Sequence, residues 1–387
     1  MRPIRWTIIL ALIPGCGGLA ETAAPPTTAA LTLPDLFVAD DRGQVVALRA
    51  GAASAPAPGI IGLDGETVVL DPVVDDDLVP VVAGTDGEWV AYASRPAGPP
   101  AEGTIAAGRA ASEIVAVSSR GVEVDVELPG NIVPEAFSLE PQGPGQAPWL
   151  YVLEYLPAEA PTHYRVRVLD PNTGQLTLPL NLRNYGFTVD TQMSGISRDQ
   201  VVASDEGLLF TLYRGHHFDE GTDYAFIHVL SMWNGVWCLE VPAEMELAAR
   251  PGVVAVSPDE KLLYAVSSNG FVAEYRIADV VDPNRTPLAT RAVPAFEGGD
   301  DPPSAVVTTA HVVVAQGQTI LWLKRADLTV EATATAPATV DALTAMPDGS
   351  LVMAMGDRLG TVDVTGSVAM GPMLPADVGR VTEIVPG

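Results

Sequence analysis

The sequence of 387 residues is poor in cysteine and in aromatic side chains, and each shortage excludes a class of protein. Two cysteines, Cys16 and Cys238, are too few for a disulfide framework. Aromatic residues make up 6% of the chain, whereas the wider apolar set makes up 48%, so alanine, valine and leucine must carry most of the burial. This composition is typical of a folded globular chain and excludes a disordered one.

Basic side chains are also scarce. Lysine and arginine total 21 against 48 acidic residues, which gives a formal net charge of −27 at pH 7. A surface this acidic repels phosphate backbones, so nucleic acid is not an expected partner. A well-solvated surface is the simplest interpretation of the charge, and a surface that attracts cations or a basic partner is the alternative.

The first residues follow the order of a secretory signal. Arg2 and Arg5 precede an apolar run over residues 6–13 that is too short to span a bilayer. The run leads into "LIPGC", which ends at Cys16 and resembles the bacterial lipoprotein signal. The resemblance implies cleavage before Cys16 and acyl chains on its sulfur and new amino group. Two or more acyl chains hold a protein stably on a membrane.

The sequence therefore predicts three parts: a signal peptide over residues 1–15, a lipidated Cys16 with a flexible tether over residues 16–34, and one folded domain over residues 35–387. Small residues and prolines without a periodic apolar face are typical of a tether. This organisation places the protein in the bacterial cell envelope, exported and lipid-anchored on the outer surface or in the periplasm. An ordinary signal cleaved near residues 18–20, with Cys16 discarded, is the alternative.

A repeating unit organises the folded part. Residues 252–277 read "GVVAVSPDEKLLYAVSSNGFVAEYRI", in which two polar turns separate three apolar runs. The second turn contains Asn269-Gly270, which favours a hairpin because both residues tolerate positive φ. Residues 340–364 repeat this plan, and weaker copies cover most of the remaining chain. Short strands in hairpins at a period of roughly 35 to 55 residues are typical of a β-propeller.

We therefore predict an all-β fold, a β-propeller of about seven four-stranded blades. One small sheet cannot bury both of its faces, so the blades must stack and the ring must close between the N- and C-terminal strands. We expect the strands in residues 36–50 to complete the last blade together with residues 340–370.

The same unit resembles the repeat of YVTN-type and WD-repeat-like β-propellers. The matching positions are Ser257, Pro258, Asp259, Lys261, Leu263, Tyr264 and Asn269. Glu260 stands where that family usually has glycine. Residues 346–354 match the turn and depart at Ser350 and Val352. The resemblance implies the propeller fold and leaves the function open, because propellers include hydrolases, lyases, oxidoreductases and scaffolds.

The segment richest in chemistry is "LYRGHHFDEGTDYAFIHV", residues 212–229. The candidate ligand or divalent-metal residues in it are His216, His217, Asp219, Glu220, Asp223 and His228. Imidazole and carboxylate groups gathered in one loop can hold a divalent metal. However, adjacent side chains of an extended chain point in opposite directions, and His228 lies in an expected strand where its ring can pack. A polar excursion between two strands is therefore the competing interpretation.

Other side chains give weaker indications. Tyr213, Arg214 and Trp233 flank the histidine segment and are candidates for a recognition surface, whereas Trp237 is expected in the core. Cys238 is expected as a small buried apolar side chain. The adjacent aspartates at 75–77 and 300–301 lack the spacing of a calcium loop, so we interpret them as solvated charge.

The favoured function is a non-enzymatic binding or scaffold module for a protein, peptide or glycan partner, without a cofactor. The alternative is a metal-assisted hydrolase or lactonase-like enzyme that uses residues 216–228. The sequence contains no G-x-S-x-G, H-E-x-x-H, C-x-x-C or P-loop motif to identify a reaction.

The lipoprotein signal makes a direct prediction about Cys16. Replacing Cys16 with serine removes the acylated sulfur, so we expect the protein to leave the detergent phase in a phase-partition measurement while its circular dichroism spectrum stays unchanged. A Cys16→Ser protein that still enters the detergent phase would contradict the lipid anchor.

Overall fold

The computed structural model describes residues 36–386, except 41–44, 50–51, 54–58, 62–67, 71–77, 85–87, 96–97, 119, 121, 140–142, 144–145, 180–192, 204–206, 218–221, 234, 281–288, 347, 375 and 377. The predicted signal peptide, Cys16 and the tether lie outside the described residues. All described elements belong to one unit, Leu31–Gly387. No helix in the described part of the chain has the length and apolar character needed to cross a membrane.

The described residues form seven four-stranded antiparallel sheets, which we call blades 1 to 6 and the closing blade. Blade 1 contains β6 (Leu78–Ala83), β7 (Trp89–Ser94), β8 (Ala111–Ser118) and β9 (Glu123–Pro129). Blade 2 contains β10 (Asn131–Phe137), β11 (Leu150–Leu156), β12 (His163–Asp170) and β13 (Gln175–Thr177). Blade 3 contains β14 (Ile196–Ala203), β15 (Leu208–His217), β16 (Thr222–Ser231) and β17 (Gly235–Glu240).

The second half of the chain continues the same pattern. Blade 4 contains β18 (Gly252–Val256), β19 (Leu262–Ser267), β20 (Phe271–Arg276) and β21 (Arg291–Pro294). Blade 5 contains β22 (Pro303–Val307), β23 (His311–Gln316), β24 (Thr319–Lys324) and β25 (Val330–Thr335). Blade 6 contains β26 (Ala342–Ala345), β27 (Leu351–Met355), β28 (Arg358–Val362) and β29 (Val368–Met373).

The closing blade joins the two ends of the chain. It contains β3 (Ala52–Ala53), β2 (Val45–Arg49), β1 (Leu36–Asp40) and β30 (Val381–Pro386), in that order across the sheet. The remaining elements are a two-stranded sheet of β4 (Gly59–Ile61) and β5 (Val68–Leu70), a 3₁₀ turn η1 (Ala243–Met245) and a single helical turn α2 (Ile277–Val280).

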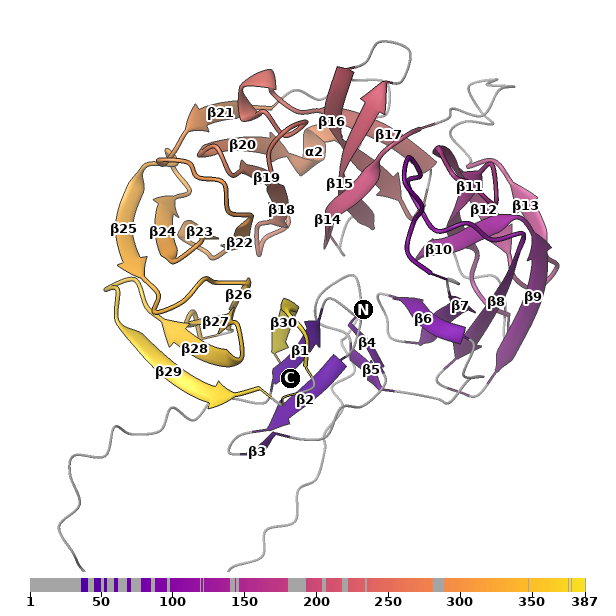
Figure 1. Cartoon of the computed structure of the whole chain (residues 1–387), viewed down its shortest axis with the longest axis horizontal. Coiled ribbons are helices and arrows are strands. Elements are labelled where there is room, and N and C mark those ends of the chain that lie inside the picture. Colours follow the sequence, from indigo (N-terminus) through magenta and orange to yellow (C-terminus); the bar gives the residue numbers. More distant parts are fainter. Residues whose placement is uncertain are drawn as a thin grey trace, which may run out of the picture. The chain divides into compact units, whose positions relative to one another are not determined.

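The blades follow one another around a common centre (Figure 1). The first strand of blades 1 to 6 lies innermost, because β14 contacts β18, β18 contacts β22 and β22 contacts β26. The closing blade places β30 in the inner position, where it contacts β26. The predicted all-β propeller of about seven four-stranded blades is therefore confirmed.

One detail of the predicted closure is wrong. Residues 340–370 do not combine with the N-terminal strands, because β26 to β29 already form a complete blade 6. The partner of β1 is β30, with Leu36 opposite Pro386 and Val38 opposite Ile384. The physical reason is that β29 supplies the outer strand that residues 340–370 need, which leaves β1 free to pair with the last strand of the chain.

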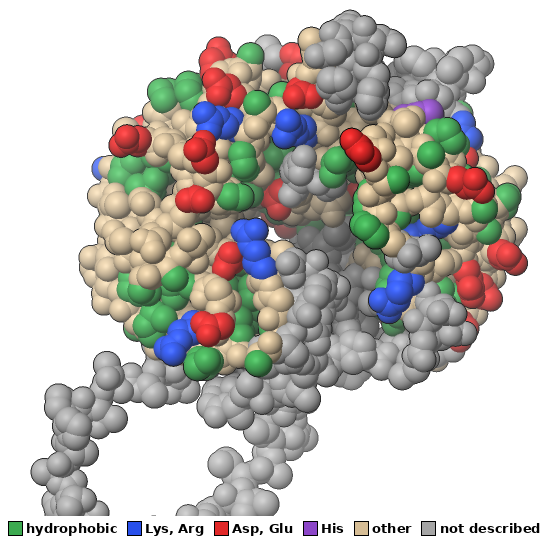
Figure 2. Space-filling view, in the orientation of Figure 1, with side chains coloured by type: hydrophobic (Ala, Val, Ile, Leu, Met, Phe, Trp, Pro, Cys, Tyr) green, Lys and Arg blue, Asp and Glu red, His purple; other side chains and the backbone are tan. Residues whose placement is uncertain are grey.

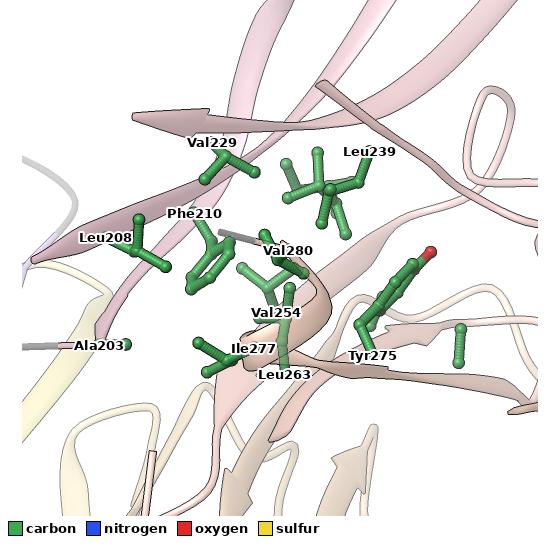
Figure 3. Packing of buried hydrophobic residues seen from close by; sticks show 14 of the residues in the cluster. Ala203, Leu208, Phe210, Val229, Leu239, Val254, Leu263, Tyr275, Ile277 and Val280 are labelled. Carbon is green, nitrogen blue, oxygen red and sulfur yellow. The ribbon is translucent and has the colours of Figure 1, made fainter. Parts of the chain in front are cut away.

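Clusters of small apolar side chains hold consecutive blades together. Figure 3 shows the cluster between blades 3 and 4, where Phe210 and Val229 meet Val254 and Leu263. Comparable clusters fill each interface from blade 1 to the closing blade. Valine, leucine and alanine dominate these clusters, as the low aromatic content predicts. Each of blades 2 to 6 therefore buries its two faces against its two neighbours.

The turn that carries the family resemblance has a clear local cause. Ser257 Oγ accepts hydrogen bonds from the backbone N–H groups of Lys261 and Leu262, at 3.2 and 3.0 Å. Glu260 has a φ of 49°, which lies in the left-handed region, at the position where the family usually has glycine. Gly270 in the next turn has a φ of 92°, and a Cβ there would lie 2.1 Å from the carbonyl oxygen of Phe296. The Asn269-Gly270 hairpin is therefore confirmed.

Figure 2 shows basic side chains beside acidic ones on one face of the molecule. Several arginines form ion pairs, among them Arg291 with Glu274 at 2.7 Å and Arg380 with Asp341 at 2.9 Å. Asp300 is 97% exposed and pairs with Arg250 at 2.6 Å. This arrangement agrees with the interpretation of Asp300 as solvated charge, whereas the aspartates at 75–77 lie outside the described residues.

The pairing of β30 with β1 makes a prediction about stability. Ile384 is 4% exposed and packs in the cluster between blade 6 and the closing blade. We expect Ile384→Ala to lower the free energy of unfolding by about 2–4 kcal/mol because it leaves a cavity at the closure. Denaturant titration measures this loss, and Thr382→Ala on the exposed side of the same strand should change it by about 0.5 kcal/mol or less. Equal effects of the two variants would contradict a closure that depends on β30.

Candidate functional site

The histidine segment forms a hairpin that extends beyond the rest of blade 3. Strands β15 and β16 are ten residues long each. The pairing of β14 with β15 reaches only Arg214, and the pairing of β16 with β17 reaches only Phe226. Three further pairs continue the hairpin, the last joining His217 to Thr222. Among the residues that the structure describes, no third strand pairs with the hairpin tip, which is therefore two-stranded.

The register separates the residues that the sequence suggested as one metal site. His216 pairs with Asp223, but His228 lies five positions farther along β16. Five residues of extended strand span about 17 Å, so His228 and Asp223 cannot share one ion. The side chains of His216 and His217, and all of Asp219 and Glu220, lie outside the described residues. Within the described ranges, no group of three His, Cys, Asp or Glu side chains is arranged to hold a metal.

A row of aromatic side chains crosses from blade 2 to the hairpin. Tyr164 of β12 stacks on Tyr213 of β15 with ring centroids 5.3 Å apart, and Tyr213 stacks on Phe226 at 5.4 Å. Phe226 in turn stacks on Tyr224 at 5.7 Å. The row begins inside the interface, where Tyr164 and Tyr213 are buried, and ends at the partly exposed Tyr224. It joins the hairpin tip rigidly to the interface between the blades.

Polar contacts fix the exposed end of this row. The Tyr224 hydroxyl lies 2.8 Å from Ser194 Oγ and donates to the backbone oxygen of Ser194 at 2.5 Å. Arg214 Nη2 donates to Asp223 Oδ2 across the hairpin at 3.4 Å, with the two side chains 37% and 44% exposed. The hairpin therefore presents an aromatic ring on one face and a pair of opposite charges on the other.

A second polar feature lies on the inner strands and was not predicted from the sequence. Gln200 of β14 donates to Glu135 of β10 at 2.8 Å and to Thr211 at 3.1 Å. On the other side of the same strand, Asp199 accepts the backbone N–H of Val254 in β18 at 2.7 Å. Strand β14 is thus tied by side chains to the inner strands of both neighbouring blades.

Bulges direct these side chains. An extra residue interrupts the register of β6 at Val81, of β10 at Glu135 and of β14 at Arg198. A fourth bulge on an inner strand is in β30 at Thr382. Bulges re-aim side chains and are frequent next to functional sites. A signal was present in the sequence, since "VPV" at 79–81 and "VPE" at 133–135 both place proline just before the bulged residue.

Both carboxyl groups on these inner strands have raised pKa values. Desolvation raises the pKa of Glu135 to about 7, against the opposing hydrogen bond from Gln200. Desolvation, with a smaller contribution from the charge of Glu383 on β30, also raises the pKa of Asp199 to about 7, against opposing hydrogen bonds from the backbone of Val254 and Gln200. Glu135 and Asp199 are partly accessible to solvent, but the surrounding protein excludes most of the water from their carboxyl groups. Glu135 accepts its hydrogen bond from β14, whereas Asp199 accepts its hydrogen bond from β18.

The structure corrects the expectation for Cys238. We expected a buried side chain, whereas Cys238 is exposed on β17. The reason is that β17 is the outermost strand of blade 3, so no further strand of that sheet lies beyond it. The surrounding protein still desolvates the Cys238 thiol, and this desolvation raises the pKa of the thiol to about 11. Trp233 is 43% exposed, and Trp237 packs partly against the cluster between blades 3 and 4, as expected.

Comparisons with known proteins leave the function open. No protein-family model matches the chain, and no curated protein matches it. One similar solved structure is the crystal structure at 1.35 Å resolution of a protein of unknown function from Bacteroides caccae. It is 11% identical, covers 91% of this chain and 98% of that chain, and has a TM-score of 0.41. This similarity assigns no function.

The raised pKa values predict how stability depends on pH. In the folded state Glu135 and Asp199 hold protons up to about pH 7, whereas in the unfolded chain they lose them near pH 4, so the free energy of unfolding falls as pH rises through this window. We expect Glu135→Gln with Asp199→Asn to flatten this fall and to stabilise the protein by about 1–3 kcal/mol at pH 8. Urea titrations at pH 5 and pH 8 measure the effect. The control Glu127→Gln, on the exposed strand β9, should show the same change in unfolding free energy between pH 5 and pH 8 as the natural protein. A Glu135→Gln, Asp199→Asn protein that shows this same change would contradict the account.

Proposed function

We propose that this chain is an exported, lipid-anchored binding module that contacts a protein or peptide partner through the tip of the β15–β16 hairpin. The propeller fold alone does not decide between an enzyme and a scaffold. The observation that carries the proposal is the hairpin itself, which continues for three residue pairs beyond β14 and β17.

The side chains on the tip are those that favour a protein partner. Tyrosine and arginine are enriched among the residues that dominate binding energy in protein interfaces. Tyr224 lies on one face of the tip, and Arg214 at the base of the tip pairs with the acidic Asp223 on the other face. Hydrogen bonds to Ser194 hold Tyr224 in place before any partner arrives. Side chains held in advance lose less conformational entropy on binding, which favours affinity.

The closed ring supports this role mechanically. The aromatic row of Tyr164, Tyr213, Phe226 and Tyr224 connects the tip to the packed interface between blades 2 and 3. A partner would therefore meet a surface that moves little, which is the usual condition for interfaces built on rigid scaffolds. The predicted tether over residues 16–34 would let such a surface reach away from the membrane.

The alternative of a metal-assisted hydrolase receives less support. It needs the histidines and carboxylates of residues 216–228 to converge, but the register places His228 about 17 Å from Asp223. Elemental analysis of the purified protein with His216 and His217 changed to alanine remains the direct test of that alternative.

Site-specific photo-crosslinking in bacterial cells that produce the full chain tests the proposal. A photoreactive residue in place of Thr222, which is exposed on the tip, should give one discrete protein adduct, and Arg214→Glu in the same chain should abolish it. The matched control is the same photoreactive residue in place of Asp363, an exposed residue of a turn in blade 6. No adduct at 222, or the same adducts at both positions, would overturn the proposal.

A further inference from the structure

A histidine and a cysteine face each other on blade 3, away from the hairpin tip. His228 of β16 and Cys238 of β17 are direct partners in the antiparallel register. They share one face of the sheet, because the next pair on that face, Leu230 with Val236, packs in the cluster between blades 2 and 3. Directly opposite residues on one face have Cβ atoms about 4.5–5.5 Å apart.

One nitrogen of the His228 imidazole has no hydrogen-bond partner. His228 is 1% exposed, and its Nε2 has no hydrogen-bond partner in the structure. Buried polar atoms almost always have a partner, so an unpaired one marks a place where a ligand can bind. The edge of the ring contacts Tyr213, with centroids 6.0 Å apart. Burial lowers the pKa of His228 to about 4, so the ring is neutral at physiological pH. Neutral imidazole is the form that binds metals.

The chemistry of the two donors selects the kind of ion. Thiolate and imidazole are ligands for soft transition metals. Metal–sulfur and metal–nitrogen bonds of about 2.3 and 2.0 Å allow one ion to bridge side chains on directly opposite residues. Two protein ligands are too few for zinc, which takes four, whereas Cu(I) accepts two ligands in line.

A third soft atom lies in the same interface. The sulfur of Met193 is 3.8 Å from the hydroxyl oxygen of Tyr164, and Tyr164 stacks on Tyr213, the ring that contacts His228. Thioethers are also ligands for Cu(I) and seldom bind hard cations. The interface between blades 2 and 3 therefore collects soft donors.

We propose that His228 and Cys238 form a binding site for one Cu(I) ion. On binding, the Cys238 thiol releases its proton to solvent, a copper–sulfur bond and a copper–Nε2 bond form, and the oxidation state of copper does not change. The exposed side of Cys238 gives the ion its entry, and Nε2 of His228 holds it from the interior. This inference does not depend on the partner proposed for the hairpin tip.

The test is an anaerobic titration of the full chain with Cu(I) in competition with the chromophoric chelator bicinchoninate. We expect the natural chain to bind one Cu(I) ion tightly. In Cys238→Ser and in His228→Gln, we expect the affinity for Cu(I) to fall by about 100-fold or more. Cys16→Ser and His163→Gln are the matched controls and should bind as the natural chain does. X-ray absorption of the loaded protein should show one sulfur and one nitrogen around copper.

The variants separate a site from adventitious binding. Cys238 is exposed, so Cys238→Ser should keep the fold even if the buried His228→Gln does not, and circular dichroism checks both. Unchanged affinity in Cys238→Ser would overturn the proposal. Copper coordination without nitrogen would also overturn it, as would a natural chain that binds Cu(I) no more tightly than a chain with both Cys238→Ser and His228→Gln.

Discussion

The pairing of β1 with β30 is the constraint on which the rest of the structure depends. A four-stranded blade cannot bury both faces alone, so each apolar cluster exists only because the next blade is present. The last interface can form only if the ring closes, and closure requires residues 36–40 to pair with residues 381–386. The chain therefore joins its most distant strands, with β30 as the inner strand beside β26.

The bulges of the inner strands and the carboxyl groups with raised pKa values lie in one half of the ring, which includes the closing blade. Bulges occur in β30, β6, β10 and β14, which are consecutive inner strands around one half of the ring. That half contains Glu135, Asp199 and Glu383, and the charge of Glu383 acts on Asp199 from the closing blade. The hairpin of β15 and β16 belongs to the same half. In blades 4 to 6, by contrast, the inner strand pairs with its neighbour without a register shift.

Local patterns in the sequence predicted the features that depend on local chemistry. The strands of blade 4 and the turn at Asn269-Gly270 lie where apolar runs and turn residues placed them. The pairing of β30 was missed because "VTEIVP" has no hairpin partner nearby, and its true partner lies at the other end of the chain. The exposure of Cys238 and its position opposite His228 depend on strand order and register, which alternation alone does not reveal. The proline before Glu135 marked a bulge without showing which neighbour its carboxyl group would meet.

Native-state hydrogen exchange of the backbone amides in β30 and β1 tests the central claim most directly. If closure holds the ring together, these amides exchange only when the whole domain unfolds, and their protection equals that of β19 and β23 in the middle of blades 4 and 5. Fast exchange in β30 and β1, with the amides of β19 and β23 still protected, would show that the ring is stable while open and would contradict the account.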